Sequence, residues 1–339
     1  MPFSLRPRLR PLLLTALTGA VLLAAYALWY LNTPVRVAVF PVEFEIAPGT
    51  GLRGAVRALD RAGIEVRPRE FELLARLSGR ATSIKAGNYE LAGPVSPQAL
   101  LDKLTRGEVA QAEITLIEGW TFAQLRATLD ASALLRHDSA GLSDPELMQR
   151  LGAPAQHPEG RFFPDTYLFA RQSSDLAVLR RALHAMQRHL DREWQSRDEG
   201  LPYKTPYEAL IMASIIEKET GSPAERDQIA GVLVNRLKIG MALQADPTVI
   251  YGLGADFDGN LKRVHLTTDG PYNTYTRPGL PPTPIALPGR ASLHAALHPA
   301  KTKALYYVSR GDGTSEFSRS LEEHNRAVTK YQLQPRRKR

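Results

Sequence analysis

The sequence predicts an α+β protein with a single apolar helix, a small α/β module and a larger mixed α/β domain. Three observations predict this fold class. An uncharged apolar stretch lies near the N-terminus, short strand-like and helix-like patterns alternate over 40–117, and longer helical patterns with a few strand-like segments fill 118–331. The length of 339 residues and the 43% hydrophobic content suffice for more than one core.

The apolar stretch predicts a membrane anchor over 11–31. About 20 apolar residues cross the hydrocarbon layer, and no charged residue occurs from Pro11 to Val35. Trp29 and Tyr30 suit the far interface, and the preceding arginines place residues 1–10 in the cytoplasm as a tail. A cleaved signal peptide is the alternative, but this stretch exceeds the usual apolar core of about 7–15 residues. We therefore expect a single-pass protein of the cytoplasmic membrane, with its remaining domains outside.

The region 40–117 is predicted to form the small module. Its Ser96–Pro97 pair is typical of a helix start, since serine caps the first turn and proline suits its first position. The segment 44–60 is echoed by 114–130, each reading as strand, glycine turn and helix. Duplication and a shared local pattern both explain this echo. The expected strands are 42–47, 85–92 and 112–119, and the expected helices are 52–63, 68–79 and 96–108.

The domain at 118–331 is predicted to be mainly helical. Its middle, from 241 to about 290, is too rich in proline and glycine for regular elements. Loops of that length are usually functional or disordered, and the tyrosines here favour an ordered, functional loop. The expected helices are 175–195, 206–220, 225–240, 292–300 and 321–332, with a strand at 304–311 and a basic tail at 332–339.

The charge distribution argues against a nucleic-acid partner. Seven of the basic residues lie in the two ends, and removing them from the net charge of +8 leaves +1 for the rest. A domain that binds nucleic acid usually carries a basic stripe on its folded surface. We therefore expect no nucleic-acid binding.

The sequence contains no motif that predicts a bound cofactor or metal. The absence of cysteine excludes thiol chemistry and cysteine-based zinc sites. His294 and His298 have zinc-ligand spacing, but the glutamate of H-E-x-x-H is missing and Pro299 follows, so we interpret them as structural. P-loop, dinucleotide and G-x-S-x-G motifs do not occur. We expect no cofactor and no metal.

The strongest candidate for acid/base chemistry is Glu219, in the helical pattern at 206–220. A helical wheel places it inside the apolar arc, whereas Ser214 and Lys218 mark the solvent side. Apolar surroundings raise the pKa of a carboxyl group, as a general acid at neutral pH requires. The alternative is a solvated glutamate at the helix end, because glycine and proline follow closely.

Longer motifs around this glutamate resemble the MltG/YceG-like family of endolytic murein transglycosylases. They occur in order, and with the apolar stretch the resemblance extends from 11 to 331. The motifs are EGRFFPDTY at 159–167, IIEKET at 215–220, SPAERDQIAGVLVNRLKIGMALQADPTVIYGLG at 222–254, PYNTYTRPGLPP at 271–282 and ALHPAKTKALYYV at 296–308.

The resemblance implies a reaction and its catalytic residue. The family's catalytic glutamate is the second of E-K-E-T, which is Glu219 here. It protonates the oxygen between N-acetylmuramic acid and N-acetylglucosamine within a glycan strand. It then takes the proton of the C6 hydroxyl, which attacks the anomeric carbon and leaves a 1,6-anhydro end. The resemblance further implies a LysM-like module at 40–117 and partners among cell-wall synthesis proteins.

Four polar residues are weaker candidates for substrate binding. Glu159 and Asp165 flank an aromatic pair and either assist catalysis or contact sugar hydroxyls, or they cap and brace a turn before Pro164. Asp246 either contacts substrate or caps the helix-like segment that follows it. Gln244 is a similar polar candidate in the same motif.

Three further candidates for substrate binding lie in the tyrosine-rich motif. Tyr272, Asn273 and Tyr275 provide the flat aromatic faces and the amide group that carbohydrate sites use. Buried packing is the alternative for both tyrosines.

Two other functions stay open. One is a hydrolase, which would pair Glu219 with a second carboxylate from Glu159, Asp165 or Asp246. The other is a wall-binding scaffold without catalysis.

Overall fold

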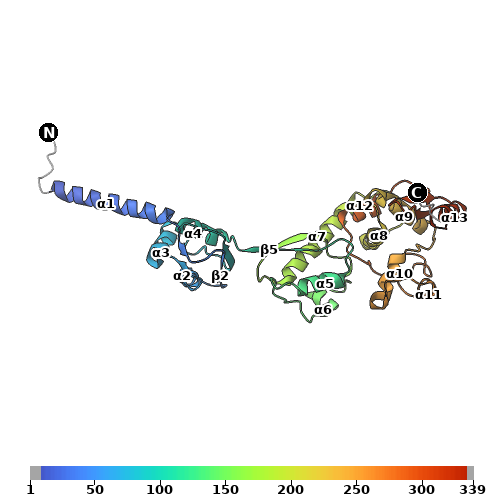
Figure 1. The fold of residues 1–339 in the computed structure, drawn as a ribbon, viewed down its shortest axis with the longest axis horizontal. Coiled ribbons are helices and arrows are strands. Elements are labelled where there is room, and N and C mark those ends of the chain that lie inside the picture. The colour runs from blue at the N-terminus through green and yellow to red at the C-terminus, as the bar shows by residue number, and fades with distance from the viewer. Residues whose placement is uncertain (1–8, 334–339) are drawn as a thin grey trace, which may run out of the picture. The chain divides into compact units, whose positions relative to one another are not determined.

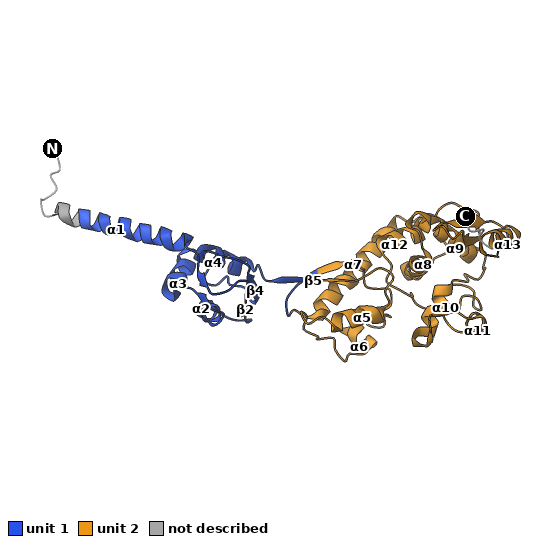
Figure 2. Ribbon diagram, viewed as in Figure 1, with its two compact units in different colours: residues 1–112, 168–172 blue, residues 113–167, 173–339 orange. Residues whose placement is uncertain are grey.

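The computed structural model describes residues 9–333, so most of the predicted cytoplasmic tail (1–10) and basic tail (332–339) lies outside the described residues. The chain divides into two compact units (Figure 2). Unit 1 comprises 1–112 and 168–172, and unit 2 comprises 113–167 and 173–339. Helices and strands are mixed throughout, as expected. The predicted boundary between 117 and 118 stays a prediction.

The first helix, α1, covers the predicted anchor. It extends over Leu9–Asn32 and contains a segment, Leu14–Asn32, that is long and apolar enough to cross a membrane. Its apolar side chains from Leu14 onward are mostly exposed. A signal sequence shares these properties, and the uncleaved anchor stays a prediction.

The rest of unit 1 forms a small core between two short antiparallel sheets and three helices. Strand β2 pairs with β4 and sets Phe44 opposite Tyr89, with their rings stacked at a centroid distance of 5.5 Å. Strand β1 pairs with β3. The elements are β1 (Arg36–Val37), β2 (Val42–Ile46), α2 (Leu52–Arg61), β3 (Ile64–Glu65), α3 (Pro68–Leu77), β4 (Gly87–Leu91) and α4 (Pro97–Arg106).

Several local predictions for the module are confirmed, and two strands were missed. Ser96 caps α4 by accepting a hydrogen bond from the Ala99 amide, and Gly107 ends that helix in the left-handed conformation that favours glycine. The strands β1 and β3 have two residues each, too few for an alternating pattern to be recognised. The likeness to LysM stays a prediction.

Strands β5 and β6 pair with each other, and the boundary between the two units falls within them. The echo of β2 and α2 is confirmed as strand, turn and helix: β5 is followed by α5, and Gly119 has the same left-handed conformation as Gly49. The elements here are β5 (Gln111–Thr115), α5 (Phe122–Asp130), α6 (Asp144–Arg150) and β6 (Thr166–Ala170).

The core of unit 2 is built around α8, which packs against α7, α9, α10 and α12 (Figure 1). A helix surrounded by other helices is apolar on all sides, and 209–216 are all buried. The remaining elements are α7 (Asp175–Gln195), α8 (Pro206–Glu219), η1 (Pro223–Glu225), α9 (Arg226–Lys238), α10 (Asp246–Leu253), η2 (Gly254–Asp256), α11 (Arg263–Thr267), α12 (Arg290–Leu297), β7 (Tyr306–Ser309), β8 (Ser315–Ser318), α13 (Leu321–Val328) and a π-helical turn, η3 (Thr329–Leu333).

The prediction that Ser214 faces solvent is wrong. It is fully buried, donates to the Ile211 carbonyl at 2.7 Å and accepts from the Ile285 amide at 3.0 Å. A helical wheel identifies the polar face of a helix, but it cannot show that another segment of the chain covers that face.

The covering segment belongs to the proline-rich region. The prediction that this region is too rich in proline for regular elements is wrong, because it contains α10, at the helix-like segment noted after Asp246, and α11. Its last part, from 283 to 289, is buried. There the Leu287 amide donates to the Trp120 carbonyl, and the Gly119 amide donates to the Leu287 carbonyl. These bonds hold the segment in a fixed path along α8.

Candidate active site

Glu219 is the last residue of α8. The helix starts at the Thr205 cap, whose hydroxyl accepts from the Glu208 amide, and ends where the Thr220 hydroxyl donates back to the Ile216 carbonyl. Glu219 is therefore attached to a rigid, buried helix while its own side chain lies at the rim of the core and is partly exposed. The Tyr307 hydroxyl, from β7, donates to Glu219 Oε2 at 2.9 Å.

The surroundings raise the pKa of Glu219 to about 7. Burial is the main cause, because it disfavours the charged form, and the negative charge of Asp246 adds to it. The Tyr307 hydrogen bond and the positive charge of Arg236 act in the opposite direction. The carboxyl group therefore exchanges its proton near neutral pH.

Arg236, from α9, is fixed beside this carboxyl group by backbone carbonyls. It is 8% exposed and donates to the carbonyls of Leu305 at 2.6 Å and Leu243 at 2.9 Å. Its guanidinium carbon lies 5.1 Å from the ring centroid of Tyr306. A cation held in this way contributes a fixed positive charge close to Glu219.

Three predicted binding residues interact with Arg236 or Glu219: Gln244 and Tyr275 with Arg236, and Asp246 with Glu219. Gln244 Oε1 accepts from Arg236 at 3.2 Å, and the Tyr275 hydroxyl donates to Asp246 Oδ1 at 2.5 Å. Asp246 is the first residue of α10, and the helix cap is Ala245 without a side-chain bond, so the alternative capping role of Asp246 is wrong.

Asn273 and Tyr272 are engaged within the protein. The Asn273 amide group donates to the carbonyls of His265, Leu266 and Thr268, and its oxygen accepts from the Tyr275 amide. The Tyr272 hydroxyl is hydrogen-bonded to Thr283 at 2.8 Å, and its ring packs edge-on against Tyr251 at 4.9 Å. Both residues therefore hold the tyrosine-rich loop, and Tyr275 with it, in place.

Glu159 forms a second buried acidic group. It is 3% exposed; its Oε1 accepts from the Phe122 amide at 2.9 Å and its Oε2 from the Tyr251 hydroxyl at 3.0 Å. Burial raises its pKa to about 7, although these hydrogen bonds lower it. Glu159 is not among the charged groups that shift the pKa of Glu219.

Asp165 is exposed and lies directly before β6. Its Oδ1 accepts from the Thr166 amide at 2.8 Å, and its carbonyl accepts from the Leu116 amide at 3.0 Å. Like Glu159, it is not among the charged groups that shift the pKa of Glu219.

Sequence reasoning did not relate Tyr307 or Arg236 to Glu219. It placed Tyr251 in a functional loop without relating it to Glu159. All three fall within motifs that support the family resemblance, but nothing in their spacing relates them to these acidic groups. Tyr307 is 88 residues away from Glu219 along the chain.

Two side-chain clusters among residues 9–333 have metal-ligand geometry, and neither includes Glu219. One contains Glu193, His294 and His298, with His294 Nδ1 2.9 Å from Glu193. The other contains Asp130, His137 and Asp175. The expectation that no metal takes part in the reaction stays a prediction.

A partly exposed glutamic acid with a near-neutral pKa, one tyrosine donor and an arginine whose charge lowers that pKa is the arrangement expected of a general acid/base enzyme. The chain belongs to the YceG-like family, whose model matches residues 44–330. The predicted family is thereby confirmed.

Similar proteins agree with this assignment. The chain is 32% identical to an endolytic murein transglycosylase from Bacillus subtilis (86% of this chain, 84% of that protein). It is 27% identical to one from Streptococcus pneumoniae, covering 86% of this chain but 58% of that relative. A crystal structure of a yceG-like protein from Listeria monocytogenes matches with a TM-score of 0.54 and 29% identity, covering 84% of this chain and 98% of that one. The predicted enzyme class, a lytic transglycosylase, is confirmed by these relatives.

Proposed function

We propose that this protein cuts peptidoglycan glycan strands internally and leaves 1,6-anhydro ends, with Glu219 as the acid and then the base. The observation that carries this proposal is a carboxyl group at the end of α8 that combines a pKa of about 7 with one oxygen free of protein hydrogen bonds among the described residues. Near neutral pH such a group is protonated in part of the molecules and ionised in the rest. It suits both halves of the reaction.

The chemistry follows from the two oxygens of Glu219. Oε2 is held by Tyr307, whereas Oε1 has no hydrogen-bond partner among the described residues. In the first half, protonated Glu219 gives its proton to the glycosidic oxygen as the bond from that oxygen to the anomeric carbon breaks. In the second half, the carboxylate takes the proton of the C6 hydroxyl as the C6 oxygen bonds to the same carbon. The carboxyl group is restored, and no water is consumed.

The neighbours of Glu219 support these steps. The Tyr307 hydroxyl and the charge of Arg236 stabilise the carboxylate after it has given up its proton. Asp246 carries negative charge near the sugar ring, where positive charge develops in the transition state. Tyr275 holds the Asp246 carboxylate in place. We propose that Gln244, with its exposed amide, contacts the sugar beside them.

A hydrolase is the second candidate, because Asp246 raises the pKa of Glu219. That coupling is the relation expected of a second catalytic carboxylate. Asp246 would then activate water or form a covalent link to the sugar, and the product would carry a reducing end. Neither Glu159 nor Asp165 is among the charges that shift the pKa of Glu219, so this coupling favours neither as the second carboxylate.

The N-terminal part suggests where the reaction takes place. We propose that α1 spans the cytoplasmic membrane and that the rest of the chain faces the cell wall. In this proposal the module is LysM-like and binds the glycan, and proteins of cell-wall synthesis are partners.

The experiment compares full-length wild type, Glu219→Gln and Glu159→Gln on purified peptidoglycan, with the released fragments identified by mass spectrometry. We expect anhydro ends from wild type and Glu159→Gln, and none above background from Glu219→Gln. Reducing ends from wild type would instead assign a hydrolase, and Asp246→Asn would then be tested. Wall binding without any released fragment, by wild type and variants alike, would contradict an enzymatic role.

A further inference from the structure

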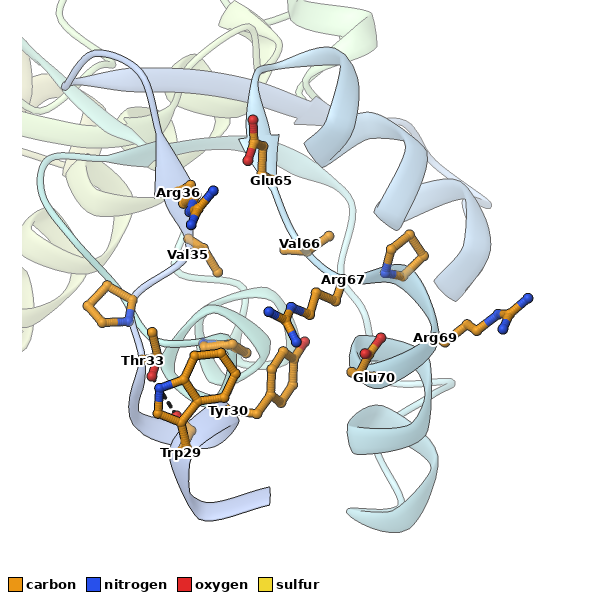
Figure 3. Close-up of a pocket in the computed structure, with 13 residues that line it drawn as sticks. Trp29, Tyr30, Thr33, Val35, Arg36, Glu65, Val66, Arg67, Arg69 and Glu70 are labelled. Carbon is orange, nitrogen blue, oxygen red and sulfur yellow. Dashed lines mark hydrogen bonds between the residues drawn. The ribbon is translucent and has the colours of Figure 1, made fainter. Parts of the chain in front are cut away.

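Unit 1 contains a cavity that the proposed reaction does not use. It has a volume of about 620 Å³ and lies between the end of α1 and the start of α3 (Figure 3). Its walls come from the last turn of α1, the segment leading into β1, the segment 65–70 and Pro97.

The cavity is lined by more positive than negative side chains. Arg36, Arg67 and Arg69 contribute three guanidinium groups against the two carboxylates of Glu65 and Glu70, which gives a net charge of +1. That charge matches a single phosphodiester. Glu65 lies directly across the β1–β3 ladder from Arg36, so the opposite charges of these two residues offset each other.

Arg67 is held at the centre of this lining by aromatic side chains of α1. Its guanidinium carbon lies 5.0 Å from the Trp29 ring centroid and 6.0 Å from that of Tyr26, and it donates to the Tyr26 hydroxyl at 2.7 Å. The Tyr26 hydroxyl in turn donates to Glu70 at 3.1 Å. These two hydrogen bonds position the guanidinium group of Arg67 and occupy one oxygen of the Glu70 carboxylate.

The start of α3 adds backbone donors to the same wall. Its cap, Arg67, forms no side-chain capping bond, and Pro68 occupies the first helical position. The first amides of a helix have no partner within the helix and favour anions. Arg69 and Glu70, which contribute the next amides, both line the cavity.

Tyr30 gives an independent sign of a ligand. It is 8% exposed, and its hydroxyl is buried without a hydrogen-bond partner among residues 9–333. Figure 3 shows this hydroxyl end directed toward Arg67. A buried hydroxyl is almost always hydrogen-bonded, because leaving it unpaired costs the free energy of its lost hydration. An oxygen acceptor beside Arg67 satisfies both groups.

We propose that this cavity binds the phosphate of a membrane phospholipid headgroup. The lipid source follows from position, since Trp29 and Tyr30 belong to the last turn of the helix that we propose spans the membrane. The inference thus rests on the proposed membrane insertion of α1. A bound headgroup holds the N-terminal module against the membrane surface, since α3 and α1 contribute to the same site.

The test uses the full chain purified in mild detergent after incubation with vesicles of phosphatidylglycerol and phosphatidylethanolamine. Native mass spectrometry counts the phospholipids that each variant retains. We expect wild type to retain one phospholipid, Arg67→Gln to retain it with about tenfold lower occupancy, and Tyr30→Phe to show a smaller loss. Arg57→Gln, an exposed arginine on α2 in the same module, is the matched control and should retain lipid as wild type does.

The outcomes separate the sources of the phosphate. Equal retention by wild type, Arg67→Gln and Tyr30→Phe would overturn the proposal; Tyr30→Phe keeps its ring, so that comparison survives if Arg67→Gln misfolds. Binding of inorganic phosphate that depends on Arg67, without retained lipid, would overturn the lipid assignment. Alkaline carbonate extraction of membranes tests the anchor separately. If alkaline carbonate releases the protein from the membranes, membrane insertion is contradicted, whatever native mass spectrometry in detergent shows.

Discussion

Glu219 and Glu159 have the same raised pKa, about 7, and the same main cause, burial. They differ in what their oxygens contact. Both oxygens of Glu159 accept hydrogen bonds from the protein, one from the Phe122 amide and one from the Tyr251 hydroxyl. Glu219 has one donor, Tyr307, and it is partly exposed. A raised pKa therefore does not identify a catalytic acid by itself; an oxygen left open to a substrate is also needed.

The largest expected effect separates the two glutamates by activity. Glu219→Gln should lower the release of anhydro ends by at least about 10³-fold, because the same group acts as acid and as base. Glu159→Gln should stay within about tenfold of wild type, since its role is to bind the Phe122 amide and Tyr251. The measurement is the initial rate of fragment release from peptidoglycan. Similar losses in both variants would contradict the distinction drawn above.

The next effect separates the two tyrosine donors. Tyr307→Phe removes a hydrogen bond that lowers the pKa of Glu219, so that pKa should rise and the alkaline limb of the activity profile should move to higher pH. The rate at the optimum should fall by about tenfold, because the carboxylate loses a donor. Rates measured from pH 5 to pH 9 test this.

Tyr251→Phe is the matched control, because it removes the donor of Glu159 instead. It should leave the alkaline limb in place and lower the free energy of unfolding by about 1–2 kcal/mol, the cost of a lost buried hydrogen bond. A shift of the limb in Tyr251→Phe would show that Glu159 also titrates in the reaction.

A third prediction concerns stability against pH. A carboxyl group whose pKa is higher in the folded state binds its proton more tightly there, so folding is favoured at low pH. This contribution is lost as pH rises from about 4.5, the usual value, to about 7. Each glutamate should contribute on the order of 2 kcal/mol to this loss.

The measurement is urea unfolding at pH 5 and pH 7.5 for wild type and both glutamine variants. Each substitution should reduce the difference between the two pH values, and here the two glutamates should act alike. An unchanged difference in Glu219→Gln would mean that its carboxyl group titrates normally.

The smallest effect is expected at Asp165. It is exposed, and its carboxylate accepts from the amide of the next residue. Asp165→Asn keeps an acceptor oxygen and should change the rate of release by no more than about twofold. A loss as large as that of Glu219→Gln would establish Asp165 as a second catalytic carboxylate.

The sequence predicted most of the elements whose apolar pattern is long. The helices α7, α8 and α9 and the cap of α4 were expected where they occur, because the helical period and the capping chemistry are local properties. Short strands such as β1, β3 and β8 were missed. Two to four residues carry too little alternation to be distinguished from a loop.

The sequence by itself also singled out Glu219, since its helix position and its motif coincide. Only the tertiary structure brought Tyr307 and Arg236 to it and showed Glu159 occupied by Phe122 and Tyr251. The physical reason is that periodicity and capping act between residues a few positions apart. Desolvation and hydrogen bonding at the site depend on segments that meet only after the chain has folded.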